Sequence, residues 1–93
     1  MTSVVKSLGT PAFWKNYRAL PAGIKDAARA AHKKFLQNPA HPSLQLERLR
    51  SDPRFWSVRV TRDFRAVAQR FEGDIWVWIW IGSHKDFDRQ FPT

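Results

Sequence analysis

Between Asp74 and His84, aliphatic residues alternate strictly with tryptophans, and this is the strongest pattern in the chain. From residue 75 to residue 81 the order is Ile-Trp-Val-Trp-Ile-Trp-Ile, so a strand would present an aliphatic face and an indole face. A strand that is apolar on both faces is usually central in its sheet, and we predict a central strand here. The sequence becomes polar from Gly82 onwards, so this rigid strand would deliver His84 to its end, where it can position chemistry. The row of tryptophans is equally consistent with ordinary hydrophobic core that packs against a layer of helices and has no functional role.

Helical periodicity precedes this strand, in two segments before residue 38. Thr10 followed by Pro11 is typical of an N-cap and a first helical position, and predicts a helix to about residue 20. Pro21 ends that helix and can begin a second one to about residue 37. The second helix has small apolar residues on one side and Lys and Arg on the other, so the two helices form an αα-hairpin that can lie flat on a sheet.

Short strand-like segments fill most of the remaining sequence. Residues 55–61 and 64–71 are separated by a two-residue reversal, and residues 72–74 form a turn into the central strand. A weak strand at residues 2–8 and a short strand or extended piece at residues 44–49 are also expected. Helices followed by consecutive strands predict an α+β fold, with a helical hairpin covering one face of an antiparallel sheet, in a single domain over residues 1–93.

Composition and charge narrow the range of functions. The chain of 93 residues has 16 Lys and Arg against 8 acidic residues, a net charge of +8, which predicts binding to polyanions or to an acidic protein. It has no cysteine, which excludes disulfides and thiolate metal ligands, and its 3 histidines do not have the spacing of a zinc site. The chain starts without the apolar stretch of a signal peptide, and residues 75–81 are too few to span a bilayer, so we expect a cytoplasmic protein.

A set of polar residues lies on or beside the predicted sheet. Its members are Glu47, Ser57, Arg59, Arg65 and His84. If residues 55–61 fold back onto residues 64–71, Arg59 and Arg65 approach each other on the face away from the helices. Two guanidinium groups so placed repel unless an anion bridges them, which indicates a phosphate site. A solvated polar face of an amphipathic sheet would give the same spacing.

Three motifs closely resemble the RelE/ParE superfamily of toxins from bacterial toxin–antitoxin modules. They are residues 55–61 (Phe-Trp-Ser-x-Arg-x-Thr), 64–67 (Phe-Arg-Ala-Val) and 78–88 (Trp-Ile-Trp-Ile-Gly-Ser-His-x-Asp-Phe-Asp). The resemblance extends over nearly the whole chain and implies two helices against a twisted antiparallel sheet, with the active groups on its concave face. It is less specific for activity, because RelE-like members cleave mRNA on the ribosome whereas ParE-like members inhibit DNA gyrase.

The resemblance also implies roles for individual residues. Arg65 matches the arginine most widely shared by the cleaving members, and Arg59 matches a basic position one strand earlier. His84 falls where the YoeB- and HigB-like branches place a histidine, and Glu47 falls near the glutamate of the YoeB-like branch.

Two positions depart from the family pattern. Ser57 stands where RelE has a lysine, and Phe87 stands where close relatives often have tyrosine. Neither a lysine-rich mechanism nor a tyrosine hydroxyl can therefore be carried over to this chain.

These matches predict a ribosome-dependent mRNA endoribonuclease of a type II module that requires neither metal nor cofactor. Arg65 and Arg59 would stabilise the scissile phosphate, His84 would be the general acid, and Glu47 would be the base or would orient one. Further RNA contacts are expected from three cations and two indoles, namely Arg50, Arg62, Lys85, Trp78 and Trp80. The indoles would stack on bases if they are exposed.

Partners and alternatives follow from the same resemblance. The expected partners are an acidic antitoxin in a heteromeric complex, the ribosome and mRNA, with no membrane. Two other functions remain open: a non-catalytic inhibitor of DNA gyrase, and a degenerate toxin that only binds its antitoxin.

Overall fold

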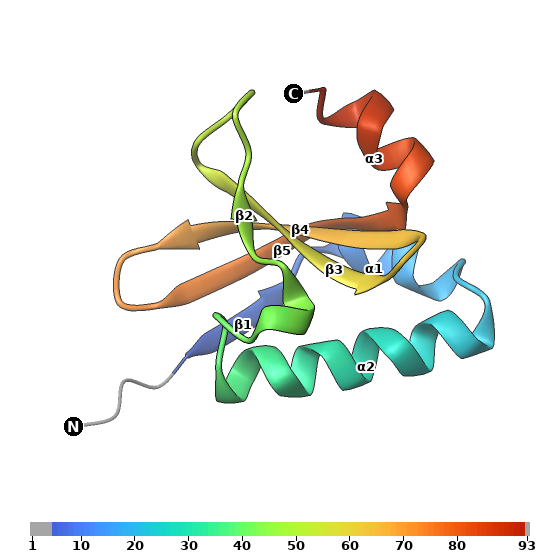
Figure 1. Cartoon of the computed structure of the whole chain (residues 1–93), viewed down its shortest axis with the longest axis horizontal. Helices are drawn as coiled ribbons and strands as arrows, with labels where there is room; N and C mark the ends of the chain where they lie inside the picture. Colours follow the sequence, from blue (N-terminus) through green and yellow to red (C-terminus); the bar gives the residue numbers. More distant parts are fainter. Residues whose placement is uncertain (1–4, 93) are drawn as a thin grey trace.

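A five-stranded sheet forms the middle layer of the computed structural model, which describes residues 5–92 (Figure 1). The elements in chain order are β1 (Lys6–Gly9), α1 (Pro11–Arg18), α2 (Ala22–Gln37), the 3₁₀ turn η1 (Pro42–Leu44), β2 (Glu47–Arg48), β3 (Phe55–Thr61), β4 (Phe64–Phe71), β5 (Ile75–Ser83) and α3 (His84–Gln90). The strands lie in the order β1-β5-β4-β3-β2. The predicted α+β class is therefore confirmed.

The sheet is mixed, so the expectation of a wholly antiparallel sheet is wrong at one edge. β1 pairs with β5 in parallel, whereas β2, β3, β4 and β5 pair antiparallel in sequence. Parallel neighbours need a long connection between them, and here the two helices and three other strands intervene between β1 and β5. Of the weak strand expected at residues 2–8, the part at residues 2–4 lies outside the described residues.

Both predicted N-terminal helices form close to the expected positions. The Thr10 hydroxyl accepts a hydrogen bond from the backbone N–H of Phe13 at 3.1 Å, which caps α1, and Pro11 occupies its first turn. The same hydroxyl donates to the carbonyl oxygen of Trp78 at 3.1 Å, so the cap also ties α1 to β5. Helix α2 begins directly after Pro21.

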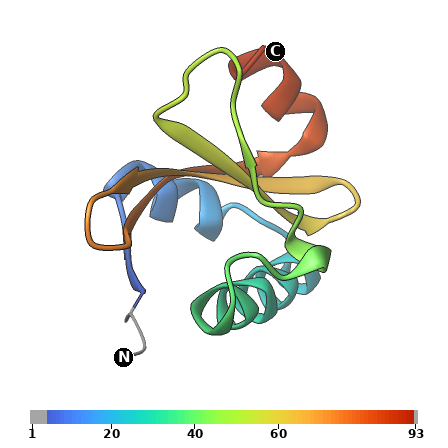
Figure 2. The same ribbon diagram turned by 60° about the vertical axis from the view of Figure 1, so that its left-hand side comes forward.

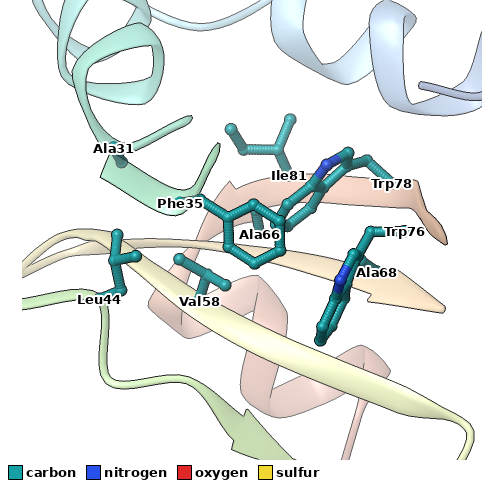
Figure 3. Close-up of a cluster of buried hydrophobic side chains, with 9 residues drawn as sticks. All are labelled: Ala31, Phe35, Leu44, Val58, Ala66, Ala68, Trp76, Trp78 and Ile81. Carbon is teal, nitrogen blue, oxygen red and sulfur yellow. The ribbon is translucent and has the colours of Figure 1, made fainter. Parts of the chain in front are cut away.

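The main core lies between these helices and the sheet. Phe35 of α2 is fully buried, and its ring packs edge-to-face with Trp76 at a centroid distance of 5.0 Å and with Trp78 at 5.1 Å (Figure 3). Small residues of β4, Ala66 and Ala68, make room beneath these rings. This cluster anchors α2 on the sheet.

A register shift divides the tryptophans of β5 between the two faces of the sheet. Val67 of β4 pairs with Trp80, but the next residue, Ala68, pairs with Trp78, so Ile79 is an extra residue of the kind found in a β-bulge. Trp76 and Trp78 consequently pack in the helix-side core, and Trp80 packs on the opposite face. The prediction of a single indole face is wrong, because a period of two cannot continue through a bulge.

The position of β5 within the sheet also differs slightly from the expectation. β5 is paired on both sides, as its apolar faces indicate, but β4 is the middle strand of the five. The doubly apolar pattern therefore identified an interior strand without specifying which one.

Helix α3 covers part of the second face, so the expectation of one covered face is wrong as well (Figure 2). Leu49, Val67, Trp80 and Phe87 form a second buried cluster there. The sequence did carry a signal for this helix, because the Ser83 hydroxyl accepts a hydrogen bond from the backbone N–H of Asp86 at 3.1 Å, as an N-cap does.

Within residues 5–92, no helix has the length and apolar character needed to cross a membrane.

Candidate functional site

A polar depression lies on the face of the sheet that carries α3, opposite α1 and α2. Its volume is about 350 Å³. It is lined by residues from β2 and the segment after it, from β3 and β4, and from α3, namely Glu47, Arg48, Leu49, Arg50, Ser57, Arg65, His84 and Phe87. Three arginines and one glutamate among these residues give the depression a net positive charge.

The strand register brings most of these side chains to one face. Glu47 pairs with Ser57 between β2 and β3, and Arg59 pairs with Arg65 between β3 and β4. Directly paired residues point to the same side of a sheet. The predicted approach of Arg59 and Arg65 on the face away from α1 and α2 is therefore confirmed.

Arg65 and His84 are in direct contact at one side of the depression. The Arg65 Nε–H donates to Nδ1 of His84 at 3.2 Å, and the Arg65 guanidinium carbon lies 5.7 Å from the centroid of the Phe87 ring. The Phe87 ring also packs against the His84 ring, with centroids 6.1 Å apart. Phe87 therefore supports both groups by packing rather than through a hydroxyl.

The backbone of His84 is fixed as well. Its N–H donates to the carbonyl oxygen of Asp63, in the β3–β4 turn, at 2.7 Å. His84 is the first residue of α3 and directly follows Ser83, the last residue of β5. The imidazole is thus positioned by a strand end, a helix start and a neighbouring turn.

Gly82 allows a close approach of the Trp80 ring. A Cβ atom at residue 82 would lie 2.6 Å from Cζ2 of Trp80, which is too close for any side chain. Gly82 does not have a positive φ, so its function here is space rather than a turn.

One residue beside the site was missed from the sequence. Asp88 has a carboxylate oxygen, Oδ2, at 3.4 Å from Nε2 of His84. The signal was the spacing of four residues, which places both side chains on one face of a helix, but it has this meaning only once residues 84–90 are known to be helical.

The other candidates are distributed unevenly around the depression. Arg50 lines it, whereas Arg59 lies beside Arg65 in the register without being part of the lining. Arg62 is exposed in the β3–β4 turn, and Lys85 is exposed on α3, and neither lines the depression.

The two candidate indoles are both buried. Trp78 is 7% exposed and Trp80 is 8% exposed, each within a hydrophobic cluster. The exposure on which the expected stacking depends is therefore not present, because a base can stack only on an accessible ring face.

No cluster of three or more His, Cys, Asp or Glu side chains within residues 5–92 has an arrangement that could hold a metal ion. The side chains of the depression themselves offer guanidinium groups that bind and stabilise anionic oxygens, and a carboxylate and an imidazole that can exchange protons.

A second cavity, of about 290 Å³, lies on the other face between α1, α2 and the sheet, and its lining is mostly apolar. At its margin the Ser7 hydroxyl accepts a hydrogen bond from Nε1 of Trp78 at 2.7 Å and lies 2.8 Å from Nε2 of His32. Partial burial lowers the pKa of His32 below its ordinary value of 6.5. This lining is unsuited to a phosphate group.

Comparison with known proteins gives one family match. Residues 22–89 match the model of the ParE-like toxin domain, a segment that includes α2, all the site residues named above and most of α3. No curated protein sequence matches the chain.

Several solved toxin structures have the same fold. The YoeB/ParE toxin from Agrobacterium tumefaciens is 21% identical, with a TM-score of 0.69 over 86% of this chain and 99% of that one. The isolated RelE toxin of E. coli is 18% identical, with a TM-score of 0.68 over 85% of this chain and 83% of that one. A chain of the RelB–RelE antitoxin–toxin complex from Methanococcus jannaschii is 17% identical, with a TM-score of 0.67 over 91% of this chain and 99% of that one.

Proposed function

Because the chain belongs to the ParE-like toxin family, we propose that it is the toxin of a type II toxin–antitoxin module and that it cleaves mRNA on the ribosome. The observation that carries this proposal is the contact between Arg65 and His84 in a cationic depression that also contains Glu47. Such a set combines an anion-stabilising group with two groups that can exchange protons.

RNA supplies its own nucleophile for this reaction. The 2′-oxygen attacks the adjacent phosphorus, the bond from phosphorus to the 5′-oxygen breaks, and a cyclic phosphate and a free 5′-hydroxyl remain. Glu47 accepts the proton of the 2′-hydroxyl, or orients the group that does, and His84 gives a proton to the departing 5′-oxygen. Arg65, with Arg59 beside it in the register, stabilises the negative charge that develops on the phosphate oxygens.

The test uses purified ribosomes programmed with a defined mRNA, incubated with and without the protein. New RNA 5′ ends should appear at the ribosome in its presence, and they should persist when divalent ions other than those that the ribosome needs are omitted. Intact mRNA at stoichiometric protein would refute the proposal.

A second candidate function is favoured by the family model itself, which is that of ParE-like toxins. In this alternative the protein inhibits DNA gyrase without cleaving RNA. It predicts intact mRNA together with altered supercoiling when the protein is added to gyrase and plasmid DNA. The two assays, run on the same preparation, separate the two functions.

We also infer an acidic antitoxin as the protein partner, in a heteromeric complex. The net charge of +8 favours an acidic partner, and the similar M. jannaschii toxin was solved in complex with an antitoxin. Co-expression with the product of the adjacent small open reading frame should give a complex that co-purifies at moderate salt. If the two proteins separate under these conditions, the assignment to a toxin–antitoxin module fails.

A further inference from the structure

The two ring nitrogens of His84 face different groups. Nδ1 accepts a hydrogen bond from Arg65 Nε–H at 3.2 Å, and Nε2 lies 3.4 Å from Oδ2 of Asp88. A guanidinium group can only donate, and a neutral imidazole carries one hydrogen. The hydrogen of the neutral ring therefore lies on Nε2, toward the carboxylate.

Helix α3 fixes the spacing of this pair. His84 and Asp88 are four residues apart on α3, so their side chains lie on the same face of the helix. The helix is capped by Ser83 and anchored by Phe87, which is buried against Val67 and Trp80. The relative position of imidazole and carboxylate is thus set by an anchored helix and not by two independently mobile side chains.

We propose that Asp88 is a positioning residue for His84, and that Nδ1 is the nitrogen that transfers the proton. This inference rests on the proposed function, because it specifies the atom through which His84 acts as the acid. Nδ1 lies against Arg65, which lines the depression where the phosphate would bind, whereas Nε2 lies toward Asp88, which does not line it. A carboxylate that holds the hydrogen on the remote nitrogen and leaves the other for proton transfer is the arrangement found in catalytic triads.

His84 gains one proton and loses one proton in the course of the reaction. When the phosphate oxygens take over the Arg65 guanidinium, Nδ1 is released and takes up a proton from water, so the ring becomes an imidazolium whose charge is paired with the Asp88 carboxylate. The Nδ1 proton then passes to the 5′-oxygen as its bond to phosphorus breaks. The ring returns to the neutral form with its hydrogen on Nε2.

Asp86 provides a matched control on the same helix. It carries the same charge two residues away, and its carboxylate lies 3.3 Å from Arg89 instead of facing His84. The side chains of Asp86 and Asp88 are 54% and 64% exposed, so replacing either with alanine should leave the fold intact. Removal of one acidic charge from α3 is common to both variants.

The first measurement is the cleavage rate on programmed ribosomes at saturating protein, together with the protein concentration that gives half of the maximal rate. Asp88→Ala should lower the rate about 10-fold, less than the loss of the acid itself, with the half-saturating concentration unchanged. Asp86→Ala should stay within about twofold of the wild type in both quantities. Equal rates for the two variants would overturn the proposal.

The second measurement does not depend on cleavage. Imidazole ¹⁵N chemical shifts report which nitrogen carries the hydrogen, and the Arg65→Ala background removes the competing donor. His84 should remain in the Nε2–H form in Arg65→Ala and become a mixture of tautomers in Arg65→Ala/Asp88→Ala. An unchanged tautomer in the double variant would overturn the role of Asp88. A wild-type protein that does not cleave mRNA would overturn the proposed function alone, and these spectra would still decide the role of Asp88.

Discussion

His84 combines a side chain suited to proton transfer with a position in the depression. An imidazole can both accept and donate a proton in the physiological range, which Lys and Arg do not readily do. In this chain its ring contacts Arg65 and Phe87 and lines the depression.

Replacing this imidazole should abolish most of the activity without unfolding the protein. We expect His84→Gln to lower the rate of mRNA cleavage about 100-fold or more, because the amide cannot act as an acid. The same substitution at His41, which lies at the start of η1 and outside the depression, should leave the rate nearly unchanged. Cleavage assays with both variants make the comparison, and near-normal cleavage by a folded His84→Gln protein would show that this histidine is structural.

Arg65 is expected to contribute to mRNA cleavage through its charge rather than through proton transfer. We expect Arg65→Ala to reduce cleavage about 100-fold, the usual scale for losing one group that stabilises the transition-state charge. Arg70 is a matched control on the same strand, because it pairs with Asp74 and stacks on Trp76 away from the depression. Arg70→Ala should leave cleavage largely intact, and equal losses in both variants would indicate a general effect of charge on RNA binding.

At the scale of elements, the junction between β5 and α3 places the site. The bulge at Ile79 turns Trp80 to the α3 face, and Gly82 leaves the space that its ring occupies. The α3 cluster, with Trp80 and Phe87, then holds the helix that carries His84 and Asp88. The geometry of the depression therefore depends on packing around one indole.

A methyl group at this junction should destabilise the protein. We expect Gly82→Ala to lower the free energy of unfolding by about 1–3 kcal/mol, because its Cβ would overlap the Trp80 ring. Gly23 in α2 has open space around it, so Gly23→Ala should be neutral or stabilise by up to about 1 kcal/mol. Urea denaturation of both variants tests this, and a fully stable Gly82→Ala protein would show that Trp80 can adopt another position.

At the scale of the whole molecule, His32 links three elements around the apolar cavity. Its ring lies 2.8 Å from the Ser7 hydroxyl, which in turn accepts a hydrogen bond from Trp78, so β1, α2 and β5 meet at this point. Partial burial lowers the pKa of His32, so the folded protein favours the neutral ring.

This lowered pKa predicts a loss of stability on acidification. Below pH 6.5 the unfolded chain takes up a proton at His32 while the folded protein resists it, so stability falls until the pH passes below the folded-state pKa. We expect the Tm of the wild type to fall more than that of His32→Gln between about pH 7 and pH 5. Parallel melting curves in which the two proteins lose the same number of degrees would contradict a contribution from His32.

The sequence by itself determined the order of the N-terminal helices and the strands, but not α3. Thr10 and the two prolines, Pro11 and Pro21, indicated where α1 and α2 begin, because caps and proline act within a few residues. The two-residue reversal between β3 and β4 was equally local, and it brought Arg59 opposite Arg65. The order of helices and consecutive strands indicated the α+β class, and the family motifs implied the same fold.

Only the tertiary structure decided which side chains lie on which face of the sheet. No local signal marks the bulge at Ile79, because it is the pairing of β5 with β4 that leaves one residue unpaired and sends Trp80 away from Trp78. The parallel pairing of β1 depends on a contact between strands almost seventy residues apart. The contact between His84 and Asp88 exists only because α3 forms on the second face, where Phe87 finds Trp80 to pack against. Local chemistry fixes where elements start and end, but the side to which each side chain points depends on which neighbours pack against it.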